Sequence, residues 1–162
     1  MSANEKTSVR IGCAAGFWGD SNAAAAQLVH GGRLDYLVLD YLAEVTMSLL
    51  ATARRKDGAT GYAHDFVSDV MALLAKALVE QDVKVIANAG GVNPEACRAA
   101  LQAALAAAGV TRTIALVLGD DLQPRADELR PHLLGFDDEG APSAQTVSLN
   151  AYLGAKHIAD AL

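Results

Sequence analysis

Short apolar runs alternate with longer amphipathic stretches along most of the chain. Four runs have the length and the aliphatic, β-branched character of strands, at 9–14, 36–40, 83–88 and 113–118. Apolar residues at helical spacing predict helices between and after them, over 22–30, 42–56, 65–80 and from 94 onward. Strands that alternate with helices predict parallel strands joined by right-handed crossovers.

This order of elements predicts the α/β class. We expect a parallel sheet of at least four strands, flanked by helices in a Rossmann-like, doubly wound arrangement, and a partial α/β barrel is the alternative. Residues 1–162 are read as a single α/β domain.

Beyond the fourth run the pattern is weaker. It predicts a helix over 124–133 that Pro131 should curtail, a loop over 136–145, a short strand at 146–149 and a last helix over 151–162. Because no strand follows that last helix, we expect the chain to be the N-terminal part of a longer protein with a C-terminal partner domain.

Composition narrows the class of protein. Hydrophobic residues make up 52% of the chain and charged residues 20%, which excludes intrinsic disorder. No run is long enough for a membrane-spanning helix, and the polar start does not resemble a secretory signal. A net charge of -6 argues against nucleic-acid binding. Cys13 and Cys97 are far apart and are read as free thiols in the core, so a cytoplasmic location is expected.

Polar and glycine-rich segments follow the first three strand candidates directly, and Gly119, Asp120 and Asp121 follow the fourth. The carboxyl ends of parallel strands meet at one edge of a sheet, and ligands of α/β proteins bind there. Glycines let a ligand approach the backbone, and the helix starts offer unpaired N–H groups to an anion. The sequence therefore predicts a ligand site at this edge.

Two carboxylates follow the second strand candidate. Asp40 closes a run that should be buried, where a polar side chain needs a partner or a function. Glu44 comes four residues later, in the first turn of the next helix. We interpret Asp40 and Glu44 as the catalytic pair, which would move protons or hold a metal ion. The structural alternative for Glu44 is a carboxylate stabilised by the helix dipole.

The ligand-binding candidates come from the turns after the first and third strand candidates. They are Trp18, Gly19, Asp20, Asn88, Gly90, Gly91 and Asn93. Trp18 either lines an apolar ligand pocket or covers the core. For Asp20 and Asn93 the alternative role is a helix cap, and for the glycines it is a tight turn.

Well-known motifs are missing from the chain. There is no Walker loop, no G-x-S-x-G elbow and no H-E-x-x-H, and no residues have the spacing of a metal site. Gly12, Gly16 and Gly19 do not have the dinucleotide-binding spacing, although Asp40 falls where a ribose-binding acid would. Nucleotide binding therefore remains an alternative function, and no cofactor is identified.

Several segments in the same order resemble one known family. They are IGCAAGFWGD at 11–20, LDYLVLDYLAE at 34–44, GYAHDF at 61–66, VIANAGGVNP at 85–94 and NAYLGA at 150–155. Together they resemble the N-terminal domain of the acyclic terpene utilisation protein AtuA family. Trp18 and Ser21 depart from that pattern, which has a smaller and a basic residue there, and Val45 stands where it has arginine.

The resemblance implies a cytoplasmic bacterial or fungal protein tied to the breakdown of acyclic terpenes such as citronellol and geraniol. That route runs through acyl-CoA intermediates, so the implied ligand is a small acyl or acyl-CoA molecule and the implied enzyme a lyase or hydrolase. The resemblance assigns no catalytic residues. The other open functions are a nucleotide-binding domain and a non-catalytic binding or assembly module, which would form a homo-oligomer or bind a partner domain.

Overall fold

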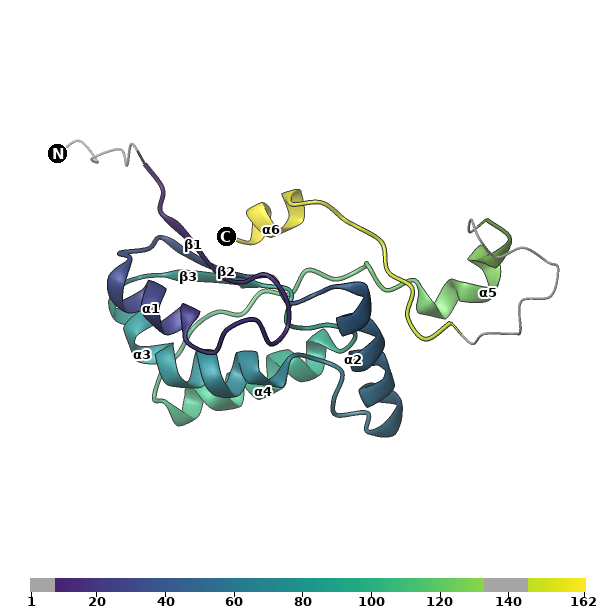
Figure 1. The fold of residues 1–162 in the computed structure, drawn as a ribbon, viewed down its shortest axis with the longest axis horizontal. Helices are drawn as coiled ribbons and strands as arrows, with labels where there is room; N and C mark the ends of the chain where they lie inside the picture. Colours follow the sequence, from purple (N-terminus) through teal and green to yellow (C-terminus); the bar gives the residue numbers. More distant parts are fainter. Residues whose placement is uncertain (1–7, 133–145) are drawn as a thin grey trace. The chain divides into compact units, whose positions relative to one another are not determined.

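The computed structural model describes residues 8–132 and 146–162 (Figure 1). The chain divides into two compact units, Met1–Ile114 and Ala115–Leu162, called unit 1 and unit 2 below. The loop expected at 136–145 lies outside the described residues.

Unit 1 contains a three-stranded parallel sheet. Its strands are β1 (Ile11–Ala15), β2 (Tyr36–Leu39) and β3 (Lys84–Ala87), in the order β1-β2-β3. In the register of the ladders, Gly12 lies opposite Leu37, and Leu37 lies opposite Val85. The predictions of these three strands and of their parallel direction are confirmed.

The helices of unit 1 follow the predicted order. They are α1 (Ala24–Gly31), α2 (Glu44–Lys56), the π-helical turn η1 (Phe66–Met71) with its continuation α3 (Ala72–Glu80), and α4 (Pro94–Ala107). Pro94 stands in the first turn of α4, where its missing N–H is not needed. The π turn was not predicted, because apolar spacing does not distinguish it from an α-helical turn. Such turns are frequent at functional sites.

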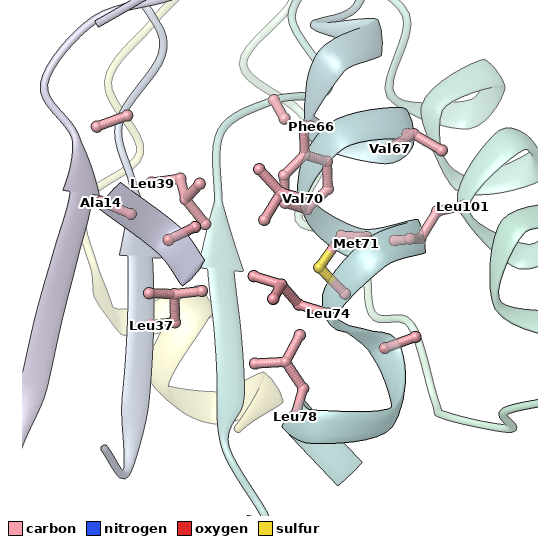
Figure 2. Packing of buried hydrophobic residues seen from close by; sticks show 14 of the residues in the cluster. Ala14, Leu37, Leu39, Phe66, Val67, Val70, Met71, Leu74, Leu78 and Leu101 are labelled. Carbon is pink, nitrogen blue, oxygen red and sulfur yellow. The ribbon is translucent and has the colours of Figure 1, made fainter. Parts of the chain in front are cut away.

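The hydrophobic core of unit 1 lies between the helices and one face of the sheet. Leu37 is 0% exposed and Leu39 2%, and the residues that alternate with them are only half-buried. Figure 2 shows Leu37 and Leu39 on the side of the sheet that faces Val70, Leu74 and Leu78. Helices α1, α3 and α4 lie on this same side (Figure 1).

No helix of the described part of unit 1 covers the opposite face of the sheet. Ile11 is 65% exposed, and the Cys13 side chain is exposed beside it. The doubly wound arrangement, with helices on both faces, is therefore not seen in the described part of unit 1, and the fold is an α/β fold with a parallel sheet flanked by helices. The prediction of Cys13 as a core thiol is wrong, whereas Cys97 is buried as predicted.

The prediction of a fourth strand is wrong. Residues 113–118 form no strand, and Val117 and Leu118 are exposed. The apolar run indicates a preference for extended backbone, but a strand also requires a neighbour with which to form a ladder. This segment spans the boundary between the two units and forms no such ladder with described residues.

The described part of unit 2 contains only short elements. They are η2 (Gln123–Arg125), α5 (Ala126–Leu129), η3 (Arg130–His132) and α6 (Lys156–Ala161). The helix predicted over 124–133 is broken into three turns, with Pro131 in the last of them. The strand predicted at 146–149 is reduced to one antiparallel bridge between Asp121 and Asn150. The last helix begins after Gly154, whose φ of 76° is not helical.

Replacement of Leu37 by alanine should destabilise the protein by about 3 kcal/mol, because the side chain is fully buried and leaves a cavity. Leu73→Ala is the matched control, since Leu73 is 75% exposed, and should cost less than about 0.5 kcal/mol. Urea unfolding followed by circular dichroism measures both. Equal losses would contradict the assignment of the buried face.

The two cysteines should differ in reactivity at pH 8. Burial raises the pKa of the Cys97 thiol from 9.0 to about 11, which lowers its thiolate fraction about a hundredfold, and the thiolate is the nucleophile. Exposed Cys13 should therefore react first with a thiol reagent. Cys13→Ser should remove the fast phase and Cys97→Ala the slow one. A single phase that disappears in neither variant would refute this.

Candidate functional site

Backbone hydrogen bonds join the carboxyl ends of β1 and β2 side by side. The Asp40 N–H donates to the Ala15 carbonyl over 3.1 Å, and the Trp18 N–H donates to the Tyr41 carbonyl over the same distance. The turn after β1 is thereby attached to the residues that follow β2. The expected edge, called the rim below, consists of the residues that directly follow the three strands.

Asn88 connects the ends of β2 and β3 through its side chain. Its Oδ1 accepts a hydrogen bond of 2.7 Å from the Tyr41 N–H, and its Nδ2 donates one of 2.6 Å to Asp40 Oδ1. Because a backbone N–H only donates, the amide oxygen must face Tyr41 and the NH₂ group must face Asp40. Asn88 therefore orients the exposed carboxylate of Asp40. An oriented, accessible carboxylate is suited to proton transfer.

Glu44 is the first residue of α2 and is exposed. In the described part of the chain no hydrogen bond links it to Asp40 or to Asn88. Its position agrees with a carboxylate stabilised by the helix dipole. The pairing of Asp40 with Glu44 stays a prediction.

Asp20 and Ser21 shape the turn between β1 and α1. Asp20 Oδ2 accepts a 2.9 Å hydrogen bond from the Gly16 N–H. Ser21 Oγ accepts hydrogen bonds from the N–H groups of Ala23 and Ala24, at 3.3 and 3.2 Å, and so supports the start of α1. The alternative reading of these polar residues as turn and cap residues thus accounts for the observed contacts.

Asn93 and the two glycines before it attach the loop at 57–64. Asn93 is buried and does not cap α4 with its side chain. Its Nδ2 instead donates to the carbonyls of Gly58 and Thr60, at 3.0 and 2.8 Å. The Val92 N–H donates to the Gly61 carbonyl. This packing accounts for Asn93, and the anion-binding role expected at this turn stays a prediction.

The close approach of the loop at 57–64 to the turn after β3 requires glycine at position 91. A Cβ there would lie 2.5 Å from Leu50 Cδ1 and 2.7 Å from the Gly61 carbonyl oxygen, and the φ of Gly91 is 53°. At Gly90 a Cβ would lie 2.9 Å from the Pro94 Cβ. Both distances at Gly91 are shorter than the contacts that real Cβ atoms make. The loop at 57–64 could therefore not dock in its present position if alanine replaced Gly91.

Trp18 attaches the turn after β1 to the helix that contains η1. Its Nε1 donates a 2.6 Å hydrogen bond to Asp65 Oδ1, and its ring meets the His64 ring edge-on with centroids 5.9 Å apart. Trp18 also packs against the core from outside. Trp18 therefore covers the core, and its role in lining a ligand pocket stays a prediction.

A narrow hollow opens between this turn, Tyr41 and the helix at η1. It is lined by Ala15, Gly19, Asp20, Ser21, Asn22, Tyr41, Asp65, Asp69 and Val70. Of the predicted ligand-binding residues it brings together Gly19 and Asp20, with Trp18 bonded to one lining residue. Asp40 and Asn88 are not among the lining residues.

Tyr41, Asp65 and Asp69 are among the residues of this hollow that sequence reasoning missed. Tyr41 and Asp65 lie in the segments 34–44 and 61–66 that carry the family resemblance, which was the available signal. Asp69 follows Asp65 at the four-residue spacing that places two side chains on one face of a helix. That spacing could have identified the pair.

Tyr41 is buried beneath the hollow. The residue is 4% exposed, and its ring packs edge-on against Phe66 with centroids 6.1 Å apart. Burial raises the pKa of its phenol, and the carboxylates of Asp65 and Asp69 raise it further. The phenol therefore stays protonated at neutral pH and keeps its hydrogen as a potential donor.

A comparison with protein families decides the relationship that the segments suggested. The family described as acyclic terpene utilisation family protein AtuA matches residues 9–162. The chain belongs to the AtuA family. No curated protein and no solved structure matches the chain.

Membership in the AtuA family implies an association with acyclic terpene utilisation. The departures that the sequence predicted for this AtuA-family chain lie at or near the rim, since Trp18 and Ser21 belong to the first turn and exposed Val45 is the second residue of α2. Among residues 8–132 and 146–162, no three His, Cys, Asp or Glu side chains are grouped so that they could hold a metal ion. None of the helices in these ranges has the length and apolar character needed to cross a membrane.

Alanine at position 91 should destabilise this AtuA-family chain more than alanine at position 19. Both glycines have positive φ, which costs an L-residue about 1–2 kcal/mol, but a Cβ at Gly19 meets nothing within 4 Å. Gly91→Ala should add an overpacking cost of about 1–3 kcal/mol. Urea unfolding of both variants measures the difference, and equal losses would show that the docking of the loop at 57–64 does not require glycine.

Proposed function

We propose that this chain binds a small acyl or acyl-CoA substrate of acyclic terpene breakdown at the rim of unit 1. The observation that carries the proposal is the exposed carboxylate of Asp40, which Asn88 holds at the tip of β2. Family membership supplies the link to acyclic terpenes. The ligand position expected in parallel α/β folds supplies the link to the rim.

In this proposal Asp40 accepts or donates the proton of the reaction, and Glu44 assists from the start of α2. Lyase and hydrolase reactions both need a proton to be moved at the bond that breaks, and a positioned carboxylate contributes about 10²–10⁴-fold to such a step. The hydrogen bond from Asn88 leaves Asp40 Oδ2 without a partner among the described residues, so that oxygen is available to a substrate.

Charge favours one orientation of an acyl-CoA substrate. The acidic side chains of Asp20, Asp40 and Asp65 at and beside the rim repel phosphate groups, so the acyl end is the part that would approach Asp40. Cationic Arg55 and Lys56 end α2, about 18 Å along the helix from Glu44 at 1.5 Å per residue. They are the candidates for contact with the phosphates.

Asp40→Asn should lower turnover of geranoyl-CoA by about a hundredfold or more, because the variant keeps the size of the side chain but loses the proton-accepting group. Glu44→Gln should lower it less. Mass spectrometry of the products measures turnover, and calorimetry compares the binding of geranoyl-CoA and of free geranate.

Glu80→Gln is the matched control, since Glu80 is an exposed carboxylate at the far end of α3. Its turnover should equal that of the original protein. Full binding and full turnover in the Asp40→Asn, Glu44→Gln double variant would overturn the proposal. Tighter binding of geranate than of its thioester would restrict it to the free acid.

A further inference from the structure

The helix α2 carries an apolar outer face that no described residue covers. Its inner face is buried, because Leu50 is 1% exposed and Ala51 4%, whereas Val45 is 72% exposed and Leu49 56%. Helices α1, α3 and α4 contact one another or the sheet, but α2 lies at the end of this layer (Figure 1). Neighbouring exposed apolar side chains on one helix face are typical of a surface that meets another chain.

The outer face of α2 has the spacing of a seam between two helices. Four of its residues follow one another at intervals of four, three and four, which is the heptad spacing: Val45, Leu49, Thr52 and Lys56. The Thr52 hydroxyl donates a 2.8 Å hydrogen bond back to the Ser48 carbonyl, so its hydrogen is already used. The methyl group of Thr52 can therefore extend the apolar stripe that Val45 and Leu49 begin.

Charge is distributed unevenly along this face. Glu44 is exposed at the first turn of α2, and Arg55 and Lys56 are exposed at its last turn. None of these three side chains forms an ion pair within residues 8–132 and 146–162. A parallel copy of the helix would bring like charges together. An antiparallel copy pairs the acid with the bases at both ends, and the two helix dipoles then oppose each other favourably.

The outer face of α2 is therefore complementary to itself. We infer that α2 packs antiparallel against α2 of a second copy of this chain, across a two-fold axis near Leu49. An isologous contact of this kind places Leu49 against its own counterpart and Val45 beside Thr52 of the second copy. It also places Lys56 of each copy beside Glu44 of the other. Each copy would thereby bring a cation to the start of the other copy's α2, next to the rim.

The expected dimer is weak. The helix has 13 residues, which corresponds to a length of about 20 Å. One helix face of that length buries less than the roughly 800 Å² per partner of a standard interface, so we expect a Kd of about 10–100 μM. The net charge of -6 on each copy also opposes association.

Sedimentation velocity of the full chain, at concentrations from tenfold below to tenfold above the expected Kd, tests the pairing. The average mass should rise from that of the monomer toward that of the dimer. Leu49→Glu should keep the chain monomeric, because it places two like charges at the two-fold axis. Leu73→Glu is the matched control and should leave the association unchanged, since Leu73 is 75% exposed but lies on α3.

Exchange of the charges tests the antiparallel direction. Glu44→Lys and Lys56→Glu should each weaken the dimer about fivefold, because each replaces two opposite-charge pairs by like-charge pairs. The double variant should recover the original affinity, since it restores both pairs with their signs reversed. A double variant that stays weak would contradict the antiparallel arrangement. Circular dichroism confirms that each variant is folded.

Other outcomes also overturn the inference. These are a monomer at every concentration, a dimer that persists in Leu49→Glu, and a dimer that is lost in Leu73→Glu. A monomer that co-sediments with vesicles of phosphatidylcholine and phosphatidylglycerol, when Leu49→Glu does not, would assign the face to a lipid surface instead.

The inference goes beyond the proposed function, because the pairing requires no ligand. Asp40→Asn separates the two proposals, since it should lower turnover of geranoyl-CoA and leave the dimer unchanged.

Discussion

The register of β2 between its two neighbours is the constraint on which the rim depends. Leu37 and Leu39 point into the core because every second residue of a strand lies on the same face. A slip of one residue would turn both leucines to the open face of the sheet, at a cost of several kcal/mol. The same slip would reverse the sides of the sheet on which Asp40 and Tyr41 lie. The buried leucines thus determine which of these two polar residues is exposed.

Hydrogen bonds from distant segments then hold the residues beyond the strands. Asn88 bonds to Tyr41 and Asp40 at a separation of 47 and 48 residues, and Trp18 bonds to Asp65 across 47 residues. Asn88 fixes the Asp40 carboxylate and the Tyr41 N–H, both of which follow β2. Trp18 fixes the carboxylate of Asp65, next to η1. The rim is therefore assembled by the sheet, and its side chains are oriented only after all three strands are in place.

The sequence was sufficient for the features that follow from local pattern. Short apolar runs predicted the three parallel strands of unit 1, and helical spacing predicted its helices. Parallel strands required Asp40 and Asn88 to share an edge. The sequence was insufficient where a strand depends on a neighbouring strand to pair with. Residues 113–118 are apolar but form no ladder with described residues. Tyr41 was missed because a tyrosine after an apolar run looks like part of the core, to which it does belong, and only the fold brings Asp65 and Asp69 near it.

Asp40 and Tyr41 are adjacent in the chain, but one is exposed and the other is buried, so they are suited to different roles. Asp40 is exposed and oriented by an amide, which suits a group that exchanges a proton with a substrate. Tyr41 is buried against Phe66 and keeps its proton, which suits a residue that supports the rim from the core. The Trp18 N–H donates to the Tyr41 carbonyl, and Asn88 Oδ1 accepts from the Tyr41 N–H, so both backbone hydrogen-bonding groups of Tyr41 are fixed. A displacement of the turn after β1 would therefore act on Tyr41 through the Trp18 N–H and on Asp40 through the Ala15 carbonyl.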